Sequence, residues 1–297
     1  MNRRSFNTLA ALAMVAGLVA ADGNTGAWAE DKAPGRIVVA GGDLTEIVFA
    51  LGAGDSVIGV DQTSNFPPEA AEREQIGYVR RLSPEGVLSL TPDLVIAAHD
   101  AGPDIALEQL EAAGVAIARA PETDAAAAIP EKIRFVGQAI DRADAAEALA
   151  ARFEADFASV KDKVATIGSS PRVLFILGIR NGAPMIGGTG TTADNMITLA
   201  GGVNAGAGVE GYKPMSREAI IAAAPDAILV MSQHADRIGG LDVILDLPEV
   251  ALTPAGQARR GIAMEGMLLL GFGPRTPDAI AELARALHAE NAVAAGL

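Results

Sequence analysis

Two short stretches of the chain combine side chains that can grip a ligand, and each holds one of the only two tyrosines. The first, Gly77 to Glu85, reads Gly-Tyr-Val-Arg-Arg-Leu-Ser-Pro-Glu. The second, Tyr212 to Glu218, reads Tyr-Lys-Pro-Met-Ser-Arg-Glu. A phenol beside a cation can hold a ligand through both an oxygen and a charge. We therefore predict that the two stretches form opposite walls of one binding cleft, with Tyr78 as the main contact.

The two stretches belong to an internal repeat. Three further matches follow when Ser83 is aligned on Ser216: Glu85 with Glu218, Pro92 with Pro225, and Asp93 with Asp226. Helix, Pro-Asp and strand follow one another in many α/β proteins, so chance is the alternative explanation. Both tyrosines fall at matching places before their serines, which favours a true repeat and hence two similar lobes.

The segments around these stretches alternate between strand and helix. From residue 36 to 120, apolar strands such as Arg36–Ala40 and Leu94–Ala98 alternate with helical segments, a pattern typical of a parallel sheet covered on both faces. The alternation resumes after Pro171. Between the two regions, Ala143–Ile167 has helical spacing and no glycine or proline, which predicts one rigid helix.

We therefore predict an α/β fold of two Rossmann-like lobes with mainly parallel sheets, joined by one long α-helix. The lobes are expected at residues 35–141 and 169–297, and the linker helix at residues 142–168. Loops at the carboxyl ends of parallel strands line the ligand site in such folds. This rule places six segments near the site: Gly41-Gly42-Asp43, Tyr78-Val79-Arg80, His99, Gly187–Thr191, Tyr212 and His234.

Residues 1–29 have the features of a cleaved signal peptide. Arg3 and Arg4 form a basic start, Leu9–Ala21 is apolar, and Ala27-Trp28-Ala29 is a small-x-small cleavage site. The Arg3-Arg4 pair fits an ordinary secretory signal or a twin-arginine signal, and the ordinary one is preferred. We expect cleavage after Ala29 and export to the periplasm.

Composition narrows the possible partners. The chain has 297 residues, a formal net charge of −14 and no cysteine. The negative charge argues against nucleic acid and anionic membranes as partners. Without cysteine we expect neither disulfides nor a lipoprotein anchor, and no later segment is long and apolar enough to insert into a membrane. We expect a soluble monomer.

A secreted α/β enzyme is the lower alternative. The sequence has no cysteine nucleophile, no Gly-x-Ser-x-Gly elbow, no cluster of histidines and no P-loop. The run Gly187-Gly188-Thr189-Gly190-Thr191 lacks the P-loop lysine and fits a turn before a helix. We expect no catalysis.

Several motifs, taken in order, resemble a known family: Gly41-Gly42-Asp43-Leu44-Thr45-Glu46-Ile47, Gly77-Tyr78-Val79-Arg80, Leu82-Ser83-Pro84-Glu85-Gly86, Tyr212-Lys213-Pro214-Met215-Ser216, Ala251–Gly256 and Leu268–Gly273. The chain resembles the periplasmic substrate-binding proteins of ABC importers that have two lobes joined by one long helix. That class serves cobalamin, siderophores and haem. Within it, the chain is most similar to the haem-binding proteins of bacterial haem importers.

The resemblance implies haem b as the transported ligand and Tyr78 as the axial ligand of its iron. Ferric iron is a hard cation, which favours a phenolate oxygen. Arg80 shares a face with Tyr78 in an extended stretch, so it would hold the phenolate or a haem propionate. A partly buried structural tyrosine is the alternative for Tyr78. Tyr212 and Lys213 are expected to contact the haem from the second lobe.

Some members of that family use a histidine of the second lobe as a further ligand. The matching region here reads Ile179-Arg180-Asn181-Gly182, so the resemblance implies one haem ligated by Tyr78 alone, with Arg180 as a propionate partner. His99 and His234 stand at strand ends facing the cleft, where either could be a sixth ligand, although a surface or loop histidine is preferred. His288 is expected to be exposed to solvent.

The resemblance also implies a partner. Family members present one glutamate per lobe to arginines of a dimeric ABC permease, and the matching residues here are Glu85 and Glu218. The alternative is that an acid in the first turn only stabilises its helix. A rigid linker helix predicts small lobe movements rather than wide closure.

The nearest alternative function is the same scaffold carrying a ferric siderophore or cobalamin. Cobalamin would favour aromatic walls, and the only tryptophan, Trp28, lies in the predicted signal peptide. A siderophore complex would favour arginines without a bond from tyrosinate to iron.

Overall fold

The computed structural model describes residues 34–122, 125–180 and 182–297, so the predicted signal peptide lies outside the described residues. The first sheet has five parallel strands in the order β3-β2-β1-β6-β7. They are β1 (Ile37–Ala40), β2 (Val57–Val60), β3 (Glu74–Gln75), β6 (Leu94–Ala97) and β7 (Ala116–Arg119). Both β1 and β6 are buried along their whole length, as central strands of a sheet covered on both faces should be.

Helices cover both faces of this sheet because successive side chains of a strand point in opposite directions. Val39 and Ile96 pack with α1 (Gly42–Ala50) and α4 (Ile129–Ala139) on one face. Val38 and Val95 pack with α2 (Pro84–Leu88) and α3 (Asp104–Ala112) on the other. Three 3-10 turns, η1 (Gly54–Ser56), η2 (Pro68–Ala70) and η3 (Ala126–Ala128), and a hairpin of β4 (Gly77–Tyr78) and β5 (Arg81–Leu82) complete this half.

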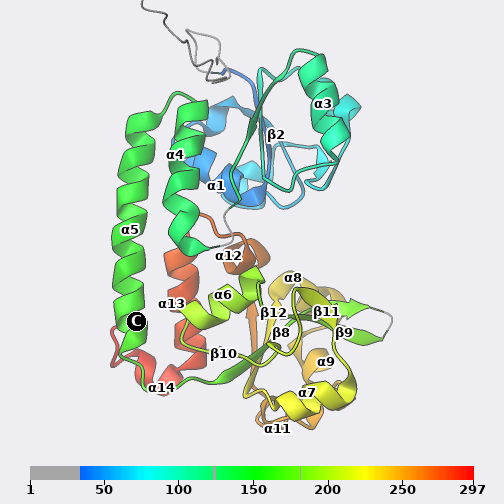
Figure 1. Cartoon of the computed structure of the whole chain (residues 1–297), viewed down its shortest axis with the longest axis vertical. Helices are drawn as coiled ribbons and strands as arrows, with labels where there is room; N and C mark the ends of the chain where they lie inside the picture. The colour runs from blue at the N-terminus through cyan, green and yellow to red at the C-terminus, as the bar shows by residue number, and fades with distance from the viewer. Residues whose placement is uncertain (1–33, 123–124, 181) are drawn as a thin grey trace, which may run out of the picture. The chain divides into compact units, whose positions relative to one another are not determined.

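A helix of 23 residues, α5 (Ala143–Ala165), follows the first half of the chain. Figure 1 shows α5 alongside α4 and alongside α13 (Thr276–Leu287), which belongs to the end of the chain. The helix starts at the predicted residue and ends at Ala165 rather than Ile167. The residue boundaries of the two lobes stay a prediction.

The second sheet is mixed. Its main order is β11-β9-β8-β12-β13, with β10 also paired to β8. The strands are β8 (Arg172–Arg180), β9 (Ala183–Gly187), β10 (Val203–Asn204), β11 (Tyr212–Pro214), β12 (Ala227–Met231) and β13 (Gly261–Met264). The β8–β9 and β9–β11 pairs are antiparallel, whereas β10, β12 and β13 pair in parallel. The structure thus confirms an α/β fold with mainly parallel sheets.

Nine helices belong to this second part in the described residues 182–297. They are α6 (Thr192–Leu199), α7 (Arg217–Ala223), α8 (Ser232–Ile238), α9 (Leu241–Leu245), α10 (Pro248–Ala251), α11 (Pro254–Gln257), α12 (Gly266–Leu270), α13 and α14 (Ala289–Ala292). Phe175 of β8 and Leu229 of β12 share one core cluster with residues of β1, α4 and α5. The described part of the chain therefore has a core that runs through both halves.

Two basic side chains join early and late segments of the chain. Lys132 of α4 is buried and donates to Asp43 Oδ2 at 2.5 Å and to the Phe272 carbonyl at 2.9 Å. Arg275 donates through Nε to Glu46 Oε2 at 2.9 Å. The motifs around Gly41 and Gly271 that marked the family resemblance therefore meet at this junction and hold it together.

His288 is buried, so the expectation of a solvent-exposed histidine is wrong. Its Nδ1 lies 3.1 Å from Ser169 Oγ and its Nε2 lies 3.1 Å from the Ala200 carbonyl. The side chain follows directly after α13 and packs against the turn after α5 and the end of α6. The sequence around it is locally amphipathic and gave no sign of these distant neighbours.

Candidate ligand-binding site

Tyr78 lies on a hairpin that is fastened to the first sheet by backbone hydrogen bonds. Gly77 has φ +92, a conformation that favours glycine, and its carbonyl accepts from Gln62 N at 2.8 Å. Val79 is buried, and its carbonyl accepts from Gly102 N at 2.9 Å. Leu82 N donates to the Gly102 carbonyl at 2.8 Å. The hairpin is thereby held against the loop that follows β6.

The hydroxyl of Tyr78 is the centre of a small charged cluster. Arg80 Nη1 donates to Tyr78 Oη at 2.5 Å, and Arg80 Nε donates to Asp100 Oδ2 at 2.7 Å. The guanidinium carbons of Arg80 and Arg81 lie 5.8 and 5.7 Å from the centre of the Tyr78 ring. Partial burial lowers the pKa of Arg80, but the hydrogen bond and charge of Asp100 outweigh it and raise that pKa.

Tyr212 stands on the edge strand β11 and carries a second, simpler polar group. Its hydroxyl lies 3.1 Å from Thr192 Oγ1 at the start of α6. Its ring meets the buried Phe175 edge to face at 6.4 Å. Lys213 and Arg180 are exposed and form no ion pair within residues 34–122, 125–180 and 182–297. Within the same ranges no hydrogen bond joins the Tyr212 group to the Tyr78 group.

The two candidate histidines differ in their exposure. His99 follows β6 as predicted, its side chain is 38% exposed, and its Nε2 lies 3.8 Å from Glu122 Oε1. His234 is buried in the first turn of α8, which begins directly after β12, and its role as a ligand contact stays a prediction. Its Nε2 has no hydrogen-bond partner among the described residues. Burial, helped by the charge of Arg237, lowers the pKa of His234.

Glu85 and Glu218 occupy equivalent exposed positions. Each is the second residue of a short helix, α2 or α7, whose N-cap serine accepts from the backbone: Ser83 from Gly86 at 3.3 Å and Ser216 from Ala219 at 3.2 Å. Neither carboxylate has an ion-pair partner in the described part of the chain. The structure therefore repeats the local geometry that the aligned sequences share.

Three residues of the Tyr78 surroundings escaped the sequence reasoning: Arg81, Asp100 and Arg119. Arg81 sits in the predicted stretch, and only its position beside the Tyr78 ring shows that it matters. Asp100 follows His99 at the strand end, which is the one signal that could have found it. Arg119 ends β7 and donates to the carbonyls of His99 and Ala101 at 2.9 and 3.2 Å.

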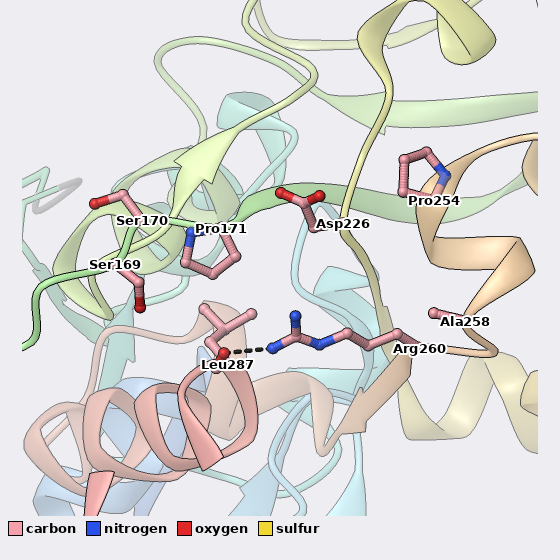
Figure 2. A pocket seen from close by; sticks show the side chains of 8 residues that line it. All are labelled: Ser169, Ser170, Pro171, Asp226, Pro254, Ala258, Arg260 and Leu287. Atoms are coloured by element: carbon pink, nitrogen blue, oxygen red, sulfur yellow. Dashed lines mark hydrogen bonds between the residues drawn. The ribbon is translucent and has the colours of Figure 1, made fainter. Parts of the chain in front are cut away.

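A hollow of about 450 Å³ is lined by none of the residues described above as candidate ligand contacts. Figure 2 shows the eight side chains that line it. Pro171, Asp226 and Arg260, three of its lining residues, directly precede β8, β12 and β13. Ligands of parallel α/β sheets bind beyond the carboxyl ends of the strands, whereas this hollow is at the amino ends. The Arg260 guanidinium is engaged by the Leu287 carbonyl. The hollow is therefore not the candidate ligand site.

We also searched the described residues for a metal site and for a membrane-spanning helix. No group of three or more His, Cys, Asp or Glu side chains is arranged to hold a metal ion within the described ranges. None of the helices in those ranges has the length and apolar character needed to cross a bilayer.

The chain has an α/β fold in which candidate ligand side chains stand on the β4–β5 hairpin beside the first sheet and on the edge strand β11 of the second. Residues 37–266 match the periplasmic binding protein family, and the chain belongs to that family. Its fold, the solved relatives and the family all agree with the sequence resemblance.

Two solved structures and one curated relative illustrate the likeness. The periplasmic heme-binding protein RhuT from Roseiflexus sp. RS-1, in apo form, is 44% identical with a TM-score of 0.82, covering 86% of this chain and 98% of that chain. The periplasmic heme-binding protein BhuT in complex with two hemes is 40% identical with a TM-score of 0.82 and the same coverage, 86% and 98%. A cobalamin-binding protein of Halobacterium salinarum is 28% identical over 87% of this chain and 70% of that protein.

Proposed function

We propose that this protein captures haem b in the periplasm and delivers it to an ABC permease in the inner membrane. The observation that supports this most directly is the Tyr78 hydroxyl, which accepts a hydrogen bond from Arg80 Nη1 at 2.5 Å. The similar proteins RhuT and BhuT are named for heme binding, which supports the same ligand here. The protein acts by binding and release, without catalysis.

Tyr78 binds the ferric iron of haem through its phenolic oxygen. A phenolate is a hard, anionic ligand and suits Fe(III), and the donor on Arg80 stabilises the negative charge on that oxygen. The ring is half-buried against the core of the first sheet, so its direction is fixed before haem arrives. Arg81 adds a second cation beside the ring.

The haem propionates pair with cations that have no other partner. Arg80 is already engaged by Tyr78 and Asp100, whereas Arg180 and Lys213 are exposed and unpaired in the described part of the chain. We propose that Arg180 and Lys213 take the propionates and that Tyr212 offers an aromatic contact from the second lobe. We propose the partly exposed His99 as the sixth ligand, in preference to His234, which is buried.

The remaining assignments concern the partner and the location. Glu85 and Glu218 dock the protein onto the dimeric permease, one glutamate from each lobe. The protein is exported with cleavage after Ala29 and works as a monomer. Glu85 and Glu218 are both exposed at the start of a helix, in equivalent positions, and this supports their docking role.

A side-by-side titration separates haem from the alternative ligand. Purified protein is titrated with haemin and with cyanocobalamin, and absorbance and tryptic protection are followed. We expect saturable binding of haemin, an equivalence point of one haem per chain, and no saturation with cyanocobalamin. Tight binding of cyanocobalamin together with weak haemin binding would contradict the proposal. An equivalence point of two would show that the chain takes haem as BhuT does.

A further inference from the structure

We propose that Asp100 is a positioning residue for Tyr78. By fixing the guanidinium of Arg80, it commits that group to the phenolic oxygen instead of to a carboxylate of the porphyrin. The inference rests on the proposed haem function and adds a residue that acts on the iron–oxygen bond without touching the haem.

The geometry of Arg80 supports this role. Its Nε and Nη2 lie 2.7 and 2.5 Å from the same oxygen of Asp100, and its Nη1 lies 2.5 Å from Tyr78 Oη. The edge of the planar guanidinium formed by Nε and Nη2 therefore lies on Asp100, and Nη1 points to Tyr78. A guanidinium is rigid and planar, so fixing one edge on Asp100 fixes the direction in which the other edge points.

Asp100 is itself held in place by the backbone. Arg119 Nε donates to the His99 carbonyl at 2.9 Å, and Arg119 Nη2 donates to the Ala101 carbonyl at 3.2 Å, on either side of Asp100. Gly102 N donates to the Val79 carbonyl at 2.9 Å and thereby ties this loop to the tyrosine hairpin. These hydrogen bonds therefore fix the main chain on either side of Asp100 relative to the Tyr78 hairpin.

Without Asp100, a haem propionate could compete with Tyr78 for the charge of Arg80. A free arginine pairs readily with carboxylates in a bidentate manner, and a bound haem brings two propionates. Arg80 is 59% exposed along its side chain, so solvent and ligand can both reach it. Asp100 occupies the Nε–Nη2 edge of the guanidinium, which a propionate would otherwise bind. The Nη1 donor is thereby kept on the phenolic oxygen of Tyr78.

Two porphyrins test the inference. Haemin and metal-free protoporphyrin IX are titrated into the wild-type protein, Asp100→Asn and a matched control, Asp246→Asn. Asp246 also accepts a hydrogen bond from an exposed arginine, Arg259, but it belongs to the second half of the chain, whereas Asp100 belongs to the first. Supporting residues around a metal ligand typically change metal affinity 10- to 100-fold, so we expect D100N to lose about tenfold in haemin affinity. Metal-free protoporphyrin should bind D100N as it binds the wild type, and D246N should be unchanged with both.

A second variant shows that Asp100 acts through Arg80. Arg80→Gln should reproduce the selective loss of haemin affinity, and adding D100N to R80Q should cause no further loss, as for two residues of one chain of contacts. Equal losses for haemin and metal-free protoporphyrin in D100N, or additive losses in the double variant, would overturn the inference. Circular dichroism of each variant confirms that it is folded.

A measurement without ligand separates this inference from the proposed function. The chain has two tyrosines, so 13Cζ labelling of tyrosine gives two resolvable NMR signals. D100N should move the Tyr78 signal in the direction that R80Q moves it, and leave the Tyr212 signal in place. If the Tyr78 signal moves in D100N as expected but the wild type does not bind haemin, the haem function alone is refuted. An unmoved Tyr78 signal in D100N would refute the positioning role.

Discussion

At the scale of single residues, Glu265 gathers more hydrogen bonds than any of the predicted site residues. It caps α12 by accepting from Met267 N at 2.8 Å and Leu268 N at 2.7 Å. Its carboxylate also accepts from Asn65 of the first half at 2.9 Å and from Gln233 of the second half at 2.8 Å. Burial alone would raise the pKa of Glu265, but these hydrogen bonds outweigh it and lower that pKa below 4.5.

This lowered pKa predicts a specific pH dependence of stability. A carboxyl whose pKa is lower in the folded state stabilises the protein above its unfolded pKa, and that stability is lost as pH falls through the folded value. Glu265→Gln should therefore lower the Tm at pH 7, and the difference from wild type should shrink as pH falls below about 4.5. Thermal melts of both proteins between pH 3 and 7 measure this.

The control for that comparison is Glu282→Gln, which removes an exposed carboxylate on α13 that has no described hydrogen bond. Its Tm difference from wild type should stay small at every pH. A gap between E265Q and wild type that stays constant across this range would contradict the assigned role of Glu265.

From the sequence, contacts between residues close together in the chain can be predicted. The spacing of Tyr78 and Arg80 predicts a shared face, and the structure has their side chains hydrogen-bonded. The N-caps Ser83 and Ser216 can be predicted in the same way, because serine is preferred at the N-cap of a helix. Asp100, His234 and His288 could not be placed, because their neighbours come from loops and helices far away in the sequence.

At the scale of elements, the packing of α4 on α5 depends on one glycine. A Cβ at Gly137 would lie 2.2 Å from the Cβ of Ala146 and 3.2 Å from the Arg142 carbonyl oxygen. No rotation of a side chain relieves a clash between two Cβ atoms. The two helices can approach as they do only because position 137 has no side chain.

Gly137→Ala should therefore destabilise the protein although alanine is the better helix former. Helix propensity favours alanine over glycine by about 1 kcal/mol, whereas overpacking a closely packed contact typically costs about 1–3 kcal/mol. Because the contact is with backbone-fixed atoms, we expect overpacking to win and the Tm to fall. Urea denaturation of G137A and the wild type gives the free energy of unfolding.

Gly168→Ala is the matched control, since Gly168 is exposed and a Cβ there meets no atom within 4 Å. Its stability should equal or slightly exceed that of the wild type. A G137A variant as stable as G168A would show that the helices separate at no cost.

Element-scale prediction succeeds where the periodicity is long and apolar. The long helix and the buried strands at 37–40, 94–97 and 227–231 follow from pattern alone. The sequence pattern after Pro171 does not predict the antiparallel strand β9 or that β8 reaches Arg180. Their pairing depends on a hairpin in which one strand, Ala183–Gly187, contains a proline and glycine that locally read as a loop.

At the scale of the whole molecule, the two glutamates of the repeat predict how the protein meets its permease. Reversing both charges, Glu85→Arg with Glu218→Arg, should abolish haemin uptake by cells that carry the permease, because in the proposed docking like charges would then face the permease arginines. Haemin affinity of the purified variant should be unchanged, since both residues lie outside the ligand contacts.

The matched control reverses two exposed mid-helix acids, Glu108→Arg with Glu282→Arg, and leaves the net charge change identical. Uptake should continue with this control. Loss of haemin binding in the Glu85 and Glu218 variant, or equal loss of uptake in the control, would refute the docking assignment.

The central claim is that Tyr78 binds the iron of haem, and one spectrum tests it most directly. Haemin is added to the wild type, Tyr78→Phe and the matched variant Tyr212→Phe, and the charge-transfer absorption of ferric tyrosinate is recorded. We predict that the wild type and Y212F show this band and that Y78F lacks it while remaining folded. The band persisting unchanged in Y78F would contradict the account.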